Sequence, residues 1–133
     1  MNLSELAAYA EEQYHIREQF KWPEWPGFSV LTDPGTGKWA ALLMRQWDYV
    51  TGTQIQRCDM KCGRQVLEEF KVSYLSVPFR MKGQKWVGIS MEEDTDPQVV
   101  RSLFDRAMQA GQQGAAIVLE EMKGMRGPGG SGI

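Results

Sequence analysis

Two segments dense in proline and glycine limit what the first third of this chain can form. The first runs from Lys21 to Gly27 and reads K-W-P-E-W-P-G; the second runs from Asp33 to Gly37 and reads D-P-G-T-G. Proline lacks an amide donor and biases the residue before it toward extended backbone, so neither segment can continue a helix. The second segment also has the composition of a tight turn. Short strands joined by turns are therefore expected here.

Helices are predicted on either side of this strand-rich region. At the N-terminus Asn2 can cap a helix, and Glu5 completes a pattern similar to a capping box, before apolar residues at helical spacing. Farther along, Asp96 is a good cap and Pro97 suits a first helical turn. Apolar residues then line one face from Val99 to Met108. Each helix thus has a start signal and one apolar face.

Five strands and one more helix are expected between them. The strand ranges are 28–31, 38–45, 53–60, 78–82 and 85–91, with a short helix over 62–70 and a turn at Gly83. Alternation along the third strand places Ile55, Arg57 and Asp59 on one face. The order α-β-β-β-α-β-β-α predicts an α+β two-layer sandwich, with an antiparallel sheet of about five strands and the helices on one face.

The length and composition are those of one domain. Residues 1–122 are expected to form it, with a possible extra C-terminal helix over 115–122, and residues 123–133 to form a flexible, glycine-rich tail. Two cysteines, Cys58 and Cys62, are too few for a disulfide framework, and neither a signal peptide nor a membrane-length apolar run is found. A cytoplasmic protein that does not associate with membranes is expected.

No set of catalytic or metal-binding residues can be assembled. The only histidine is His15, which leaves too few partners for most hydrolase schemes and too few ligands for zinc. The stretch Gly35 to Lys38 lacks the full phosphate-loop pattern, because position 39 is tryptophan and a strand follows. We therefore expect neither enzymatic activity, nor a cofactor, nor a metal.

The motifs, taken in order, resemble those of the MmcQ/YjbR family of small bacterial proteins. The matching segments are Trp22–Pro26, then G-K-W-A-A-L-L-M from Gly37, D-M-K-C from Asp59, and F-R-M-K-G-Q-K-W from Phe79. The family has G-K-W-F-A-L-I-M, N-L-K-C and Y-H-M-N-K-x-H-W in these places, and the resemblance spans about Leu3 to Met108. It implies a two-layer α+β fold, and the family's usual name includes the words "DNA-binding". Arg80, Lys82 and Gly83 depart from the family pattern.

The middle of the chain is a local basic region. From Arg57 to Lys85 there are seven basic and three acidic residues, a net charge of +4, whereas the rest, with eight basic and fourteen acidic residues, carries −6. If the hairpin packs its aliphatic face on the helices, Arg80, Lys82 and Trp86 lie on the open side, and Arg57 points the same way. Basic groups beside an aromatic ring suit phosphate contacts and base stacking.

Two functions remain open. The first is a non-enzymatic DNA-binding domain, in which Arg57, Arg80, Lys82 and Lys85 contact phosphate and Trp86 stacks or wedges, unless Trp86 is a core residue and the charges are only solvated. The second is a protein-binding or chaperone-like adaptor, in which Trp22 and Trp25 form an exposed aromatic patch, unless they form a lid over the core. The sequence does not predict an oligomeric state.

Overall fold

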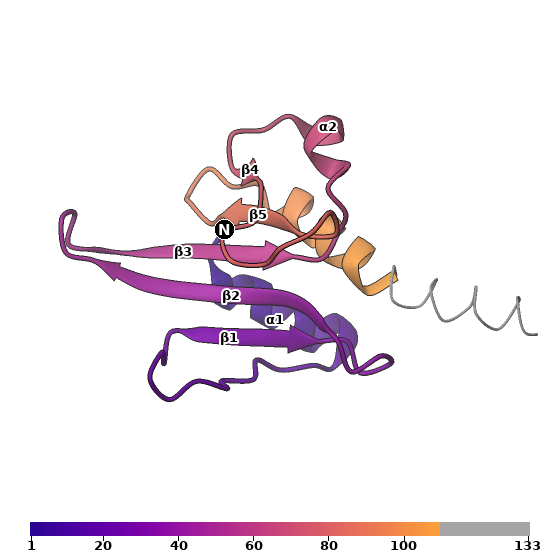
Figure 1. Ribbon diagram of the computed structural model, residues 1–133, viewed down its shortest axis with the longest axis horizontal. Helices are drawn as coiled ribbons and strands as arrows, with labels where there is room; N and C mark the ends of the chain where they lie inside the picture. The colour runs from indigo at the N-terminus through magenta and orange to yellow at the C-terminus, as the bar shows by residue number, and fades with distance from the viewer. Residues whose placement is uncertain (110–133) are drawn as a thin grey trace, which may run out of the picture.

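A five-stranded antiparallel sheet forms one layer of the molecule (Figure 1). The structure is a computed structural model that describes residues 1–109. The strands are β1 (Phe28–Thr32), β2 (Trp39–Asp48), β3 (Thr53–Met60), β4 (Leu75–Ser76) and β5 (Val87–Ser90), in the spatial order β1-β2-β3-β5-β4. Every pair of neighbours is antiparallel. The predicted α+β class and the order α-β-β-β-α-β-β-α are confirmed.

The helices are α1 (Leu3–Tyr14), α2 (Val66–Phe70) and a closing helix over residues 97–109 of the described chain. Asn2 Oδ1 accepts the amide hydrogen of Glu5 at 2.8 Å, and Asp96 Oδ1 accepts that of Gln98 at 2.9 Å. Both predicted caps are therefore formed, each satisfying an amide that has no partner inside its helix.

The main core lies between the sheet and the long helices. Leu6 of α1 and Leu103 of the closing helix are fully buried against Leu43, Met60 and Ile89 of the sheet. The two helices also meet through edge-on contacts of Tyr9 and Tyr14 with Phe104, at centroid distances of 6.4 and 5.5 Å. In Figure 1 both helices lie behind the sheet, as the two-layer prediction requires.

A second, smaller apolar cluster lies on the other face of the sheet, called here the open face. Phe28 and Val30 of β1 and Leu42 and Met44 of β2 form it; the partly buried side chains packed against it are Trp22, Trp39 and Met81. The proline-rich segment therefore covers part of this face. Burying these apolar groups contributes of the order of 25 cal/mol per Å² of area removed from water.

The second hairpin differs from the prediction. On the side away from β3, β5 pairs with the two-residue strand Leu75–Ser76, whereas residues 78–82, the expected hairpin partner, form no strand. The amides of Phe79, Arg80 and Met81 donate to a carboxylate of β3 instead of to a neighbouring strand. Pro78, which has no amide, begins this segment and cannot donate to a ladder. The loop over residues 77–86 therefore crosses the open face.

The short helix begins later than expected. Residues 62–65 precede α2 and are not helical. Gly63 has φ of 93°, which residues with a side chain rarely adopt. The amides of Gly63 and Arg64 donate to the carbonyls of Lys85 and Gln84 at 2.9 and 2.8 Å. These bonds tie the start of α2 to the end of loop 77–86.

Some sequence-based expectations fall beyond the described residues. The expected helix over 115–122, the end of the domain at 122 and the glycine-rich tail over 123–133 all lie outside residues 1–109. Among residues 1–109, no helix has both the length and the apolar character needed to span a bilayer.

Candidate nucleic-acid interface

The site begins with the alternation of β3. Cys58 and Met60 point into the main core, so Arg57 and Asp59 point to the open face, as predicted. In the register with β2, Arg57 lies opposite Met44 and Asp59 lies opposite Leu42. One basic and one acidic side chain therefore stand beside the apolar cluster of the open face.

Asp59 fixes the loop that crosses this face. Its side chain is fully buried, and its two oxygens accept the amide hydrogens of Phe79, Arg80 and Met81 at 2.7, 2.7 and 2.8 Å. A buried carboxylate must be compensated, and three charge-assisted hydrogen bonds supply that compensation. The loop thus has a defined position directly over β3.

A glycine on β5 permits this close approach. A Cβ atom added at Gly88 would lie 2.5 Å from the carbonyl oxygen of Val77 and 2.9 Å from Cε2 of Phe79. Gly88 is paired with Asp59 across the β3–β5 ladder. The missing side chain and the neighbouring carboxylate together let the backbone and the Phe79 ring lie against the sheet.

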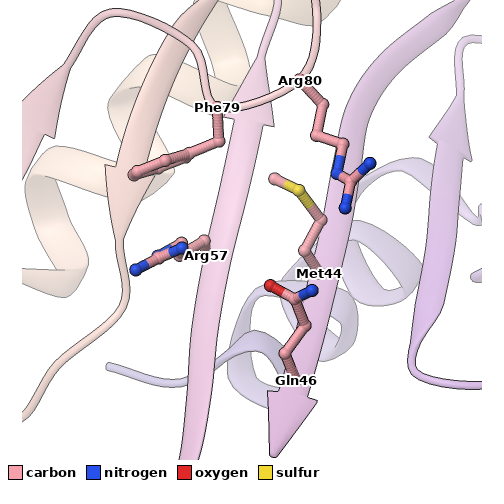
Figure 2. A pocket seen from close by; sticks show the side chains of 5 residues that line it. All are labelled: Met44, Gln46, Arg57, Phe79 and Arg80. Atoms are coloured by element: carbon pink, nitrogen blue, oxygen red, sulfur yellow. The ribbon is translucent and has the colours of Figure 1, made fainter. Parts of the chain in front are cut away.

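The loop and the sheet line an open pocket of about 390 Å³ (Figure 2). The side chains that line it are Met44 and Gln46 from β2, Arg57 from β3, and Phe79 and Arg80 from the loop. The volume lies within the range of small-molecule sites, about 300–1,000 Å³. Among the described residues, the lining contains two guanidinium groups and no carboxylate.

Both guanidinium groups lie over aromatic rings. Arg57 Cζ is 4.9 Å from the ring centroid of Phe79, and Arg80 Cζ is 5.3 and 5.8 Å from the centroids of Phe28 and Trp25. A guanidinium that stacks on a ring keeps its N–H donors directed outward in its own plane. Within residues 1–109 neither side chain makes an ion pair or donates a hydrogen bond. In this part of the chain the donors therefore remain open to a ligand.

The structure brings together only part of the predicted phosphate-binding set. Arg57 and Arg80 line one pocket, whereas Lys82 and Lys85 are exposed outside its lining. Lys85 instead lies near Lys61, whose pKa is lowered first by burial and then by the charges of Lys85 and Lys38. The predicted basic surface is thus split between the pocket and the end of β3.

Trp86 does not offer an exposed ring for stacking; it is buried, as the alternative of a core residue expected. Its side chain is only 7% exposed. Arg64 Nε donates to the carbonyl of Trp86 at 3.0 Å, and Arg64 Nη2 donates to that of Gly83 at 2.7 Å, which draws the end of the loop against the chain before α2. Large aromatic side chains are mostly buried, and Trp86 follows this tendency.

The two tryptophans of the proline-rich segment have different surroundings. Trp22 packs edge-on against Trp39 at 5.6 Å and belongs to the cover of the open face, as the lid interpretation expects. Trp25 is 51% exposed and lies beside Arg80. Trp25, which belongs to the residues predicted for the protein-binding alternative, therefore lies next to Arg80 at the candidate site.

Sequence reasoning missed Phe79 and Gln46. Alternation in the expected strand 78–82 assigned Phe79 to the inner face, whereas its ring is 38% exposed at the pocket. Pro78 was the signal against that strand, because proline is rare inside a ladder. Gln46 was missed because β2 continues three residues beyond the predicted end at 45.

The two cysteines are buried free thiols. Burial raises the pKa of Cys58 well above its ordinary value, and it raises the pKa of Cys62 to about 12. The thiolate is the reactive form, so neither group is a nucleophile near neutral pH.

Comparisons with known proteins identify the fold. No family model and no curated protein matches the chain. A crystal structure of a structural-genomics target from Pseudomonas syringae is 18% identical, with a TM-score of 0.71 over 83% of this chain and 98% of that chain. A solution NMR structure of the same structural-genomics target from Pseudomonas syringae is 20% identical, with a TM-score of 0.67 over 83% of this chain and 92% of that chain. At these identities the likeness shows a shared fold.

Proposed function

We propose that the protein is a non-enzymatic nucleic-acid-binding domain whose open face holds phosphate with Arg57 and Arg80. The observation that carries the proposal is that two arginines line one pocket of the open face, while the guanidinium group of each lies over an aromatic ring and makes no ion pair in residues 1–109. Charge-assisted hydrogen bonds to phosphate are among the strongest that proteins make. The exposed rings of Phe79 and Trp25 offer surfaces on which bases can stack.

The resemblance to the MmcQ/YjbR family supports this proposal through the family's usual name. Its pattern has a histidine where Arg80 stands, and histidine is only partly charged near neutral pH. Arginine carries a permanent charge and a fork of donors that matches phosphate. This departure strengthens the phosphate-binding character of the pocket.

A single strand fits this face better than a duplex. The pocket is an open depression on the sheet surface beside loop 77–86. Splayed bases of a single strand can enter such a depression and stack on rings. We therefore expect tighter binding to single-stranded DNA or RNA than to duplex DNA.

The test is a salt titration of binding to a fluorescent single strand and to a matched duplex. Replacing Arg57 or Arg80 with glutamine is expected to reduce the slope of log K against log salt by about 0.7 for each phosphate that the variant no longer neutralises. Arg101→Gln is the matched control, because Arg101 is exposed on the closing helix, on the opposite face of the sheet. Unchanged slopes in both pocket variants, or no binding at low salt, would refute the proposal.

A protein-binding adaptor is the second candidate, and a different surface favours it. The β2–β3 hairpin projects beyond the rest of the sheet (Figure 1). Its tip carries Tyr49 and Val50, which are 90% and 94% exposed, and Trp47 is also exposed. Exposed apolar groups clustered on a projection are typical of partner-binding sites. Replacing Tyr49 and Val50 with serine should abolish capture of a partner and leave oligonucleotide binding unchanged.

A further inference from the structure

A second group of basic residues lies at the end of β3, outside the pocket. Lys61 directly follows β3, and its amide donates at 2.9 Å to the carbonyl of Ala40, which lies two residues after Lys38. The amide of Gly63 donates to the carbonyl of Lys85, also at 2.9 Å. These two backbone hydrogen bonds bring together three lysines from segments that are far apart in sequence. We call Lys38, Lys61 and Lys85 the lysine cluster.

The charges of the lysine cluster repel one another. The pKa of Lys61 is lowered first by burial, then by the charge of Lys85 and then by that of Lys38. Asp33 acts in the opposite direction, but its effect is smaller than that of either lysine. Among residues 1–109, no carboxylate lies within ion-pair distance of these ammonium groups. Like charges held together disfavour their charged forms, so a bound anion would relieve this repulsion.

Arg64 fixes the backbone beside the lysine cluster and adds to its charge. Its Nε and Nη2 atoms donate to the carbonyls of Trp86 and Gly83, which lie on either side of Lys85 in the sequence. Both acceptors are neutral, and in the described part of the chain the guanidinium makes no ion pair. Clustered positive charge of this kind raises the local concentration of anions.

The lysine cluster and the pocket lie along one path on the open face. Cys62, like Met60, belongs to the main core, so Lys61 between them faces the same way as Arg57. Four residues of extended chain separate Arg57 from Lys61, a distance of about 13 Å. Loop 77–86 makes the same connection, because it begins beside the pocket and ends at the cluster, with exposed Lys82 on the way. Basic side chains spaced along a path are what single-strand-binding proteins use to follow a nucleic-acid backbone.

We propose that the lysine cluster is a second phosphate-binding surface, over which the backbone of a single strand continues after it leaves the pocket. The inference rests on the proposed nucleic-acid function and adds Lys38 and Lys61 to the residues that carry it. Lysine ammonium groups are point charges on flexible stems, so they contact phosphates whatever the sequence of the strand. The cluster therefore contributes affinity without base preference, and the rings beside the pocket stack on the bases.

The experiment is a salt titration of binding to a fluorescent single strand of about ten nucleotides, a length within the usual site size of such proteins. The proteins are the full chain, a cluster variant with all three lysines of the cluster changed to glutamine, and the two pocket variants Arg57→Gln and Arg80→Gln. A matched control removes the same charge from three exposed positions outside both surfaces, through Arg17→Gln, Lys71→Gln and Arg101→Gln. Circular dichroism checks that each protein is folded.

The cluster variant is expected to lower the slope of log K against log salt by up to about 2, since each phosphate no longer neutralised removes about 0.7. The control should keep the slope of the parent. In the parent, the strand should also slow acetylation of the three cluster lysines by an amine-reactive reagent, followed by mass spectrometry, and leave that of exposed Lys71 unchanged. This second measurement does not require any substitution to be tolerated.

The outcomes separate this inference from the proposed function. An unchanged slope in the cluster variant without protection of its lysines, or an equal loss of slope in the control, would overturn the inference, while a lower slope in the pocket variants would still support the pocket. A lower slope in the cluster variant with unchanged slopes in both pocket variants would refute the role of the pocket and support the cluster. A parent that binds no strand at low salt would refute both.

Discussion

At the scale of single residues, Asp59 connects the fold to the candidate site. Its carboxylate accepts three amide hydrogens from a loop about twenty positions later in the chain, and so fixes the segment that carries Phe79 and Arg80. The side chains of that loop would otherwise have no defined relation to Arg57. The pocket therefore depends on an acid that does not itself line it.

Replacing Asp59 with asparagine is expected to destabilise the protein. The amide group of asparagine brings donors toward the loop amides, so at least one buried N–H loses its acceptor, at a cost of about 1–3 kcal/mol. The free energy of unfolding in urea measures the effect. Asp94→Asn, the same change at an exposed position, should leave stability within about 0.5 kcal/mol of the parent. Equal stability of Asp59→Asn and the parent would show that the three bonds contribute nothing net.

The residue-level features that sequence could predict are local ones. Asn2 and Asp96 act on amides two or three positions away, and the outward direction of Arg57 follows from strand alternation alone. The role of Asp59 could not be predicted, because its partners are distant in sequence and nothing in the local pattern identifies them. The sequence alone therefore predicts only part of the pocket.

At the scale of elements, loop 77–86 is the segment where the prediction and the structure differ most. Its composition fits a hairpin, but its amides bond to a side chain and its end is tied to the residues before α2. Tertiary contacts thus override the local preference. The consequence for the site is direct, because a regular strand would have placed Phe79 and Arg80 on opposite faces of the sheet.

Gly88→Ala is expected to displace this loop from the sheet. The new methyl group would meet the carbonyl of Val77 at 2.5 Å, so the loop or the strand has to shift, and such overpacking costs about 1–3 kcal/mol. A lower thermal midpoint and weaker oligonucleotide binding should appear together. Ser90→Ala is the control on the same strand and the same face. A Gly88→Ala protein with parental stability and binding would show that the close packing of the loop is unnecessary.

At the scale of the whole molecule, the fold favours the neutral, protonated forms of several cysteine thiols and tyrosine hydroxyl groups. Burial is the first cause that raises the pKa of Cys58, Cys62, Tyr9, Tyr14 and Tyr74. The hydroxyl groups of Tyr9 and Tyr14 also donate to the carboxylate of Asp105, at 2.6 to 3.0 Å, which joins α1 to the closing helix. The fold thus favours the protonated state of groups drawn from both of its layers.

Stability is therefore expected to fall in alkaline solution. A group whose pKa is raised by folding contributes its full stabilisation below its unfolded pKa and loses it as the pH rises toward the folded pKa. For Cys62 this window extends from 9.0 to about 12. The free energy of unfolding should be nearly constant from pH 7 to 8 and then decline, by up to about 1.4 kcal/mol per pH unit for one such group.

Urea unfolding at a series of pH values checks this expectation. Cys62→Ala should have a shallower decline above pH 9 than the parent, whatever its stability at neutral pH, because the variant lacks one of the groups that titrate. Slopes are compared rather than absolute stabilities, since removing a buried thiol also changes packing. Identical slopes for the parent and the variant would exclude Cys62 as a contributor.

The way in which Asp59 holds its loop has a consequence for redesign. Its oxygens bind backbone amides, which every residue except proline provides, so these three hydrogen bonds do not depend on the identity of the side chains at 79, 80 and 81. Substitutions at 79 and 80 change what the pocket presents while the backbone beneath them keeps this anchor. Randomising these two positions in a library, with Met81 kept for its packing on the open face, and selecting against chosen ligands would use the natural fold as a scaffold with an exchangeable recognition segment.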